Sequence, residues 1–168
     1  MGIFLKDINL KDKTALITGA TKGLGRGAAK AIAQVGGNII AVGRNQSELI
    51  SLEKELKKFK VNYISFNCDV NDYEKLKSFI SKLKKLDILV NNAGTNLPES
   101  FLNVKKSSME TLLNVNTKAV FNVAQLCANQ MIKLKRKNCS IINISSIFGL
   151  VAGQKRTVYS MTKFGVEG

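Results

Sequence analysis

The fold of this chain is decided by the stretch Thr14-Ala-Leu-Ile-Thr-Gly-Ala-Thr-Lys-Gly-Leu-Gly25. It begins with an apolar run, Thr14–Ile17, that predicts a buried β-strand. A turn rich in glycine follows, and an alanine-rich segment of helical character continues to Gly36-Gly37, a pair typical of the end of a helix. Strand, glycine turn and helix in this order are the first part of a β-α-β unit.

Four further apolar runs continue the alternation of strands and helices. Several are apolar at nearly every position, which is typical of strands buried on both faces of a parallel sheet. The sequence therefore predicts an α/β fold with a doubly wound parallel sheet, in a single domain spanning residues 1–168. The further predicted strands are Asn38–Val42, Tyr63–Asn67, Ile88–Asn91 and Ser140–Ser145.

Capping residues mark where three of the helices should begin. In each place a residue that favours the N-cap stands three positions before a glutamate. The predicted pairs are Asn45 with Glu48, Asn71 with Glu74, and Ser107 with Glu110.

A long apolar helix is predicted around Met109–Ile132. Its apolar side chains are numerous enough to cover the sheet and to reach a partner subunit. They are Leu112, Leu113, Val120, Val123, Cys127 and Met131.

Length and composition indicate one globular domain of 168 residues, of which 45% are hydrophobic and 23% charged. No apolar run reaches the roughly 18 residues that span a bilayer. The apolar start, Met1–Lys6, is too short for a signal peptide. We therefore expect a soluble, cytoplasmic protein without a membrane partner.

The net charge of +14, from 26 basic and 12 acidic residues, is compatible with nucleic-acid binding. However, the lysines are spread over several segments, and no aromatic residues interleave with them as in a single-strand binder. The densest run, Lys133–Lys137, falls where a helix should end, and cations there complement the helix dipole. We expect no nucleic-acid partner and consider anionic cofactors and substrates the better explanation.

The 168 residues contain no histidine, which excludes histidine-based catalytic dyads and triads and most zinc sites among them. Three cysteines, Cys68, Cys127 and Cys139, lie far apart without metal-ligand spacing. We interpret them as buried thiols and predict no metal site.

The glycine turn predicts a phosphate-binding loop. Glycines permit a tight turn and let backbone N–H groups approach a pyrophosphate, and the flanking strand and helix strengthen this interpretation. Dinucleotide folds commonly carry an acidic residue after the second strand, but here the strand leads to Arg44. Arg44 and Lys22 together would fit a 2′-phosphate and disfavour a bare ribose. The alternative is that Arg44 is a solvated loop residue.

Tyr159 and Lys163 stand four positions apart, which places them on one face of a helix. A lysine ammonium beside a tyrosine hydroxyl stabilises the phenolate, and this makes a tyrosine an acid/base near neutral pH. The same spacing is common on solvated helix faces, so the pair does not establish a site by itself.

These motifs, taken together and in order from Leu10 to the last residue, resemble those of the short-chain dehydrogenases/reductases. The resemblance implies a Rossmann-type sheet with strand order 3-2-1-4-5 in the portion present. The motifs are the glycine turn from Thr18 to Gly25, Asp69-Val70, Asn91-Asn92-Ala93-Gly94, Asn116, Ser146 and the pair Tyr159/Lys163.

The resemblance implies a catalytic set of four residues. Asn116 would hold a water in a proton relay, with a solvated helix face as the alternative. Ser146, thirteen positions before Tyr159, would donate a hydrogen bond to the substrate oxygen. Tyr159 would be the acid/base, and Lys163 would assist it and hold the nicotinamide ribose.

The resemblance also implies a set of cofactor-binding residues. Asp69 would bind the adenine amino group, with capping of the following helix as the alternative. The set is Thr18, Gly19, Thr21, Lys22, Gly23, Leu24, Gly25, Arg44, Asp69, Val70, Asn92, Ala93, Gly94, Tyr159 and Lys163.

The implied function is that of an NADP-dependent oxidoreductase, with NADP(H) favoured over NAD(H), that interconverts a carbonyl and a secondary alcohol by hydride transfer. The chain is most similar to family members that act on 3-oxoacyl thioesters or on sugar acids such as ketogluconate, and these members usually form homotetramers or dimers. The alternative is a non-catalytic regulatory or interaction protein that binds a dinucleotide on the same fold.

The family pattern continues beyond Gly168 with further strands and a substrate lid. We therefore expect this chain to be a fragment of a longer protein, with its fifth strand as an exposed apolar edge. The final helix is expected to have barely two turns after Thr157.

Overall fold

The computed structural model describes residues 8–168, and the sheet within them is parallel throughout, with strand order β3-β2-β1-β4-β5. This confirms the predicted doubly wound α/β fold. The N-terminal run Met1–Lys6, interpreted above as too short for a signal peptide, lies outside the described residues. The strands are β1 (Thr14–Thr18), β2 (Asn38–Gly43), β3 (Tyr63–Asn67), β4 (Ile88–Asn91) and β5 (Ser140–Asn143).

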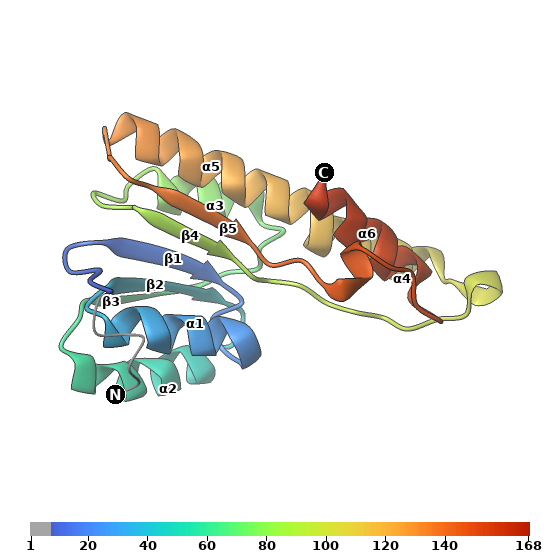
Figure 1. The fold of residues 1–168 in the computed structure, drawn as a ribbon, viewed down its shortest axis with the longest axis horizontal. Helices are drawn as coiled ribbons and strands as arrows, with labels where there is room; N and C mark the ends of the chain where they lie inside the picture. Colours follow the sequence, from blue (N-terminus) through green and yellow to red (C-terminus); the bar gives the residue numbers. More distant parts are fainter. Residues whose placement is uncertain (1–7) are drawn as a thin grey trace.

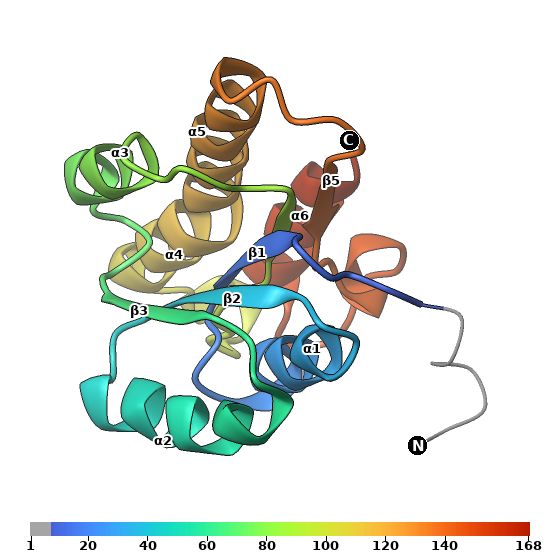
Figure 2. The ribbon, with the colours of Figure 1, turned by 90° about the vertical axis from the view of Figure 1, so that its left-hand side faces the viewer.

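Helices cover both faces of the sheet (Figure 1). Helices α1 (Gly23–Gln34) and α2 (Gln46–Leu56) lie on one face, and α3 (Tyr73–Ile80) and α5 (Ala119–Lys133) lie on the other. Helices α4 (Lys106–Leu113) and α6 (Thr157–Glu167) pack against each other beyond the carboxyl ends of the strands (Figures 1 and 2). Short 3-10 turns occupy Lys57–Phe59, Phe101–Asn103 and Ile147–Gly149, and a π-helical segment occupies Asn114–Lys118.

The sheet separates two hydrophobic cores. Neighbouring residues of β1 point to opposite faces, so Leu16 packs in the core under α3 and α5, and Ile17 packs in the core under α1 and α2. The inner strand β1 is buried at every position, whereas β5 forms an edge whose Ile141 and Ile142 are 41% and 47% exposed. The described residues contain no helix that is long and apolar enough to cross a membrane.

The strand predictions differ from the structure only at their ends. Strands β3 and β4 have the predicted bounds, and β1 and β2 extend one residue further, to Thr18 and Gly43. Strand β5 ends at Asn143 rather than Ser145. After Ile144 donates a last backbone hydrogen bond to Asn91, the Ser145 hydroxyl donates to the Lys163 carbonyl oxygen at 3.4 Å, away from the sheet.

The end of α1 and the start of α2 are confirmed. Gly36 has φ of +90°, and the amides of Gly36 and Gly37 donate to the carbonyls of Ala33 and Ile32, which is the Schellman arrangement. The Asn45 side chain caps α2 by accepting from the Glu48 amide at 3.2 Å.

The other two capping predictions are wrong. Helix α3 is capped by Asp72, whose carboxylate accepts from the Lys75 amide at 3.1 Å. The Asn71 amide instead donates to the Asp69 carboxylate at 2.9 Å. The neighbouring residue Asp72 is thus the cap in place of Asn71.

Helix α4 begins one residue before the predicted cap Ser107, so Ser107 lies inside the helix. The residue before the helix, Lys105, has no capping side chain of its own. Glu99, from a preceding loop, accepts from the Lys105 amide at 3.2 Å and from the Ser108 hydroxyl at 3.0 Å. A distant carboxylate therefore supplies the acceptor that a local cap usually provides.

The long predicted helix is present as α4, the π-helical segment and α5. Most of its apolar side chains are buried, and Leu113 is half-buried.

Cys68 and Cys127 are buried as predicted, and burial raises the pKa of the Cys127 thiol to about 12. The prediction of a buried thiol is wrong for Cys139, which is partly exposed beside the start of the edge strand β5.

Helix α6 is longer than expected. It spans eleven residues, Thr157–Glu167, which is about three turns rather than two. Its inward face buries Ser160, Thr162 and Lys163 against the π-helical segment and the turn after β5.

Candidate active site

A cleft of about 1020 Å³ opens at the carboxyl ends of the first four strands. Ligands of open α/β sheets bind at this edge, where the strand order reverses between β1 and β4. Ten of the predicted cofactor residues line the cleft: Gly19, Thr21, Lys22, Leu24, Arg44, Asp69, Val70, Asn92, Ala93 and Gly94.

The glycine turn requires glycine for two different reasons. Gly19 and Gly23 have φ of +62° and +55°, which L-residues with a side chain rarely adopt. Gly25 has an ordinary φ, but a Cβ there would lie 2.4 Å from both the Gly19 carbonyl oxygen and Asn92 Nδ2. The last glycine therefore lets α1 approach the turn closely, while the first two shape it.

Thr18 is fully buried and does not line the cleft. Its hydroxyl oxygen accepts from the backbone amides of Asn92 and Ala93, each at 3.0 Å. The Asn92 side chain returns two hydrogen bonds, to the Thr18 carbonyl at 3.0 Å and the Gly19 carbonyl at 3.2 Å. These bonds fasten the chain after β4 to the glycine turn, so one rigid wall of the cleft is formed from two strands.

Arg44 and Asp69 meet at the rim of the cleft. An Arg44 Nη1 atom lies 3.5 Å from Asp69 Oδ2, and the Arg44 side chain is 78% exposed. The other Asp69 oxygen accepts from the Asn71 amide, and Asp72 caps α3, so Asp69 is not the cap of that helix. Lys22 is exposed in the glycine turn and lines the same cleft.

Asn116 lies in the π-helical segment and is fully buried, so the alternative of a solvated helix face is wrong. Its side-chain amide makes two hydrogen bonds to the backbone of Thr95. It donates to the Thr95 carbonyl at 2.8 Å and accepts from the Thr95 N–H at 2.9 Å. It also donates to the Thr162 hydroxyl of α6 at 3.3 Å. Asn116 thus joins the chain after β4 to α6. Irregular π turns are frequent at functional sites.

Lys163 is 4% exposed, and its ammonium donates to the Ile144 carbonyl at 2.7 Å. It lies 5.9 Å from the centre of the Tyr159 ring. Burial lowers the pKa of Lys163, and the charge of Glu167 partly opposes this shift. A Cβ on Gly94 would lie 3.4 Å from Asn116 Oδ1 and 3.9 Å from Lys163 Nζ. A side chain at this position would therefore contact both polar groups.

The neighbouring serines after β5 have different contacts. The Ser146 oxygen accepts from the Phe148 amide at 3.2 Å and caps the short turn Ile147–Gly149, whereas Ser145 bonds to the Lys163 carbonyl. The Phe148 ring meets the Tyr159 ring edge to face, with centroids 6.2 Å apart. The turn that carries Ser146 is thus packed against the half-buried Tyr159.

The structure brings Asn116 and Lys163 close to Gly94, which lines the cleft, and Lys163 lies beside the Tyr159 ring. The four predicted catalytic residues, Asn116, Ser146, Tyr159 and Lys163, do not themselves line the cleft. Sequence reasoning missed other residues that line the cleft, among them Thr95 and Glu48. Thr95 follows Gly94 directly, so its position beside that motif was a usable signal. The N3 position of Glu48 was interpreted only as part of a capping box.

Comparison with known proteins assigns the family. The sequence model of the family described as short chain dehydrogenase matches residues 13–168. The chain therefore belongs to the short-chain dehydrogenase family.

Individual relatives and structures agree with this assignment. The chain is 34% identical to the 3-oxoacyl-(acyl-carrier-protein) reductase FabG of Thermotoga maritima, over 96% of this chain and 66% of that protein. It is also 34% identical to carbonyl reductase (NADPH) 2 of Sus scrofa, over 93% of this chain and 62% of that protein. Carveol dehydrogenase from Mycobacterium avium, solved in complex with NAD, has a TM-score of 0.87 at 26% identity, covering 94% of this chain and 63% of that chain. The chain spans about two thirds of the length of these proteins.

Proposed function

We propose that this chain carries the cofactor cleft and the proton-transfer residues of an NADP-dependent oxidoreductase that interconverts a carbonyl and a secondary alcohol. The observation that carries the proposal is the convergence of buried Lys163 and Asn116 on Gly94, at the wall of a cleft shaped by a glycine turn. Because Gly94 has no side chain, the backbone there would allow the close approach of a flat ring such as nicotinamide. Bound NADPH would supply the hydride that reduces the carbonyl carbon.

The residues of the chain would stabilise and protonate the carbonyl oxygen of the substrate. As negative charge builds on that oxygen, the Tyr159 hydroxyl donates a proton to it, and in the reverse direction the phenolate takes the proton back. Ser146 donates a hydrogen bond to the same oxygen. The Lys163 ammonium stabilises the phenolate that remains, and Asn116 supports the relay that returns the proton.

Two cations support NADP over NAD as the cofactor, because the position after the second strand holds Arg44 rather than an acid. Lys22 and Arg44 both line the cleft, where the second strand meets the glycine turn. Guanidinium and ammonium groups suit a 2′-phosphate dianion. The complex of carveol dehydrogenase with NAD marks the competing choice within the family. Arg44→Asp should move the preference toward NAD, and an unchanged preference would refute the phosphate assignment.

The substrate class that we propose is a 3-oxoacyl thioester or a sugar acid, handled by a homo-oligomer in the cytoplasm. The name of the Thermotoga relative favours the thioester. Exposed apolar residues on α4 and α5 support assembly through these helices, since Met109, Phe121 and Ile132 are 41%, 63% and 75% exposed.

Fluorescence titration with NADPH and NADH, followed by turnover assays on carbonyl substrates, tests the proposal. Tyr159→Phe should lower turnover by at least about a hundredfold while leaving NADPH affinity nearly unchanged, because only the proton donor is lost. A folded wild-type protein that binds neither dinucleotide would contradict the proposed function.

A further inference from the structure

We propose that Arg26 is a specificity-determining residue, which neutralises Glu48 at the wall of the cleft and so keeps the cleft suited to a phosphorylated ribose. This inference rests on the proposed function, because it concerns which dinucleotide the cleft prefers. Arg26 belongs to the first turn of α1 and does not itself line the cleft, whereas Glu48 does.

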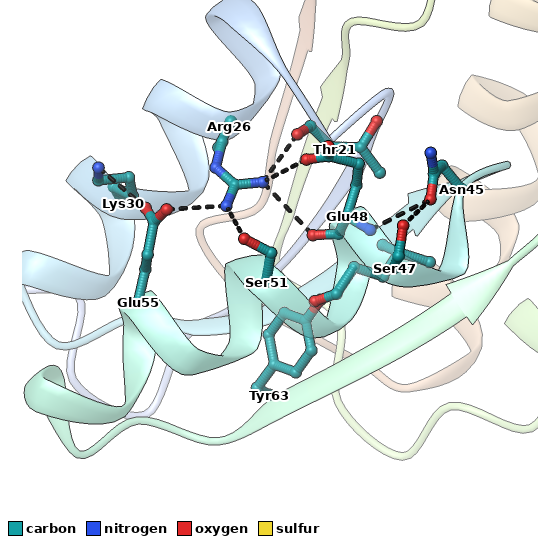
Figure 3. Close-up of polar contacts among 10 residues, drawn as sticks. Thr21, Arg26, Lys30, Asn45, Ser47, Glu48, Ser51, Glu55 and Tyr63 are labelled. Carbon is teal, nitrogen blue, oxygen red and sulfur yellow. Dashed lines mark hydrogen bonds and ion pairs between the residues drawn. The ribbon is translucent and has the colours of Figure 1, made fainter.

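The Arg26 guanidinium connects three elements (Figure 3). Its Nη1 atom donates to the Thr21 carbonyl at 2.8 Å and to Glu48 Oε2 at 3.2 Å. Its Nη2 atom donates to the Ser51 hydroxyl and to Glu55 Oε1, both at 2.8 Å. The Arg26 side chain is 17% exposed. A planar guanidinium with this many partners is held in one orientation.

Glu48 places a carboxylate in the region where the 2′-phosphate would bind. It follows Arg44 by four positions, and both residues line the cleft together with Thr21. Its side chain is 48% exposed. An unpaired carboxylate there accepts hydrogen bonds from ribose hydroxyls and repels a phosphate, which is the role of the acidic residue in NAD-binding folds. Pairing with Arg26 cancels that charge.

Glu55 anchors the arginine on the side away from the cleft. It accepts from Arg26 and lies 3.0 Å from Lys30, and hydrogen bonds from these two cations lower the pKa of Glu55 to about 2. Glu55 is therefore charged throughout the physiological pH range. The two cations and two carboxylates of this network balance. Arg44 lies beside the Asp69 carboxylate, so Lys22 leaves the wall of the cleft with a net positive charge.

The contact with Thr21 adds a geometric component. The Thr21 methyl group packs beside Gly43, where a Cβ would lie 2.6 Å from it. By holding the Thr21 carbonyl, Arg26 fixes the spacing between the glycine turn and the end of β2, which carry the cations Lys22 and Arg44.

The test measures dissociation constants for NADPH and NADH with four variants: Arg26→Met, Glu48→Gln, the double variant Arg26→Met/Glu48→Gln, and Lys30→Met. Arg26→Met should lower the preference for NADPH by about tenfold, because one uncompensated charge then faces the phosphate. The double variant should recover the wild-type preference to within about threefold, because the charge is removed again. Glu48→Gln alone should raise the preference, since it leaves Arg26 without that counter-charge.

Lys30→Met is the matched control. It removes a cation from the same network one turn further along α1, beside Glu55 and away from the cleft, so the preference should not change. The loss caused by Arg26→Met should also shrink at high salt, which screens a charge effect but does not repair a displaced loop.

Two outcomes would overturn the proposal. In one, Arg26→Met weakens NADPH and NADH equally. In the other, the double variant keeps the altered preference, which would make Arg26 merely structural. If Arg26→Met does not fold, an unchanged preference in Glu48→Gln refutes the charge argument by itself. Failure of the proposed function looks different, because the wild-type protein would then bind neither dinucleotide.

Discussion

Replacing Asp87 by alanine should be the most destabilising change at the amino-terminal edge of the sheet. The Asp87 side chain is fully buried, and it accepts from the Thr14 amide at 2.9 Å and from Arg136 Nε at 2.8 Å. Lys13 lies 3.7 Å away. One carboxylate therefore ties the start of β1 to the turn that leads into β5.

The magnitude follows from what each partner loses. Removing one member of a buried ion pair costs about 3–5 kcal/mol. The Arg136 side chain is 29% exposed and can be partly rehydrated, so we expect the lower part of this range, about 3 kcal/mol. Asp87→Asn removes the charge but keeps an acceptor for the Thr14 amide, so it should cost about 1 kcal/mol less than Asp87→Ala.

Urea unfolding followed by circular dichroism measures both variants. A loss of about 3 kcal/mol lowers the midpoint by about 1–3 M for a typical dependence on urea. The exposed pair Lys30–Glu55 is the control, and Lys30→Met should leave the midpoint nearly unchanged. If Asp87→Ala stays within about 1 kcal/mol of the wild type, the ion pair does not stabilise the sheet as argued.

Two further changes test the site. Gly25→Ala should destabilise the protein by about 1–3 kcal/mol and weaken dinucleotide binding, because the new Cβ meets the Gly19 carbonyl oxygen. Gly27→Ala is the control on the same helix. A Cβ there meets nothing within 4 Å, so this variant should be neutral or slightly stabilising in the same assays. Lys163→Met tests the lowered pKa of Lys163, because the unfolded chain binds the Lys163 proton more readily than the folded protein does. The stability of the wild type relative to the variant should therefore rise as the pH increases through the lowered folded pKa toward 10.5. Urea midpoints of wild type and variant that differ equally at neutral pH and at pH 10.5 would contradict this.

The fold was predictable because short apolar runs alternate with helical segments, and both signals are local. The ends of the strands were less predictable. Strand β5 stops before Ser145, because the Ser145 hydroxyl donates to the carbonyl of Lys163, which lies 18 residues later in the chain. The cap at Asn45 was predicted correctly because its acceptor and donor lie within one turn. The start of α4 was not, because its acceptor comes from Glu99 in a separate loop.

The site shows the same division. The positions of Gly19, Lys22 and Gly94 in the cleft follow from motifs at strand ends. The burial of Asn116 depends on contacts with Thr95 and α6, so helix propensity alone suggested a solvated face.

Arg26 was overlooked because its partners lie on another helix. Glu48, Ser51 and Glu55 are spaced to share one face of α2, and this polar stripe was the available signal.

The π-helical segment Asn114–Lys118 makes the site sensitive to chain length as well as to residue type. A π turn holds one residue more than an α turn, and each residue of an α-helix rotates the chain by about 100°. Deleting a single codon in this segment would allow α4 and α5 to join as an ordinary helix, with little change in helix content. The Asn116 amide would then be out of phase with Thr95 and Thr162, although Asn116, Ser146, Tyr159 and Lys163 could all still be encoded.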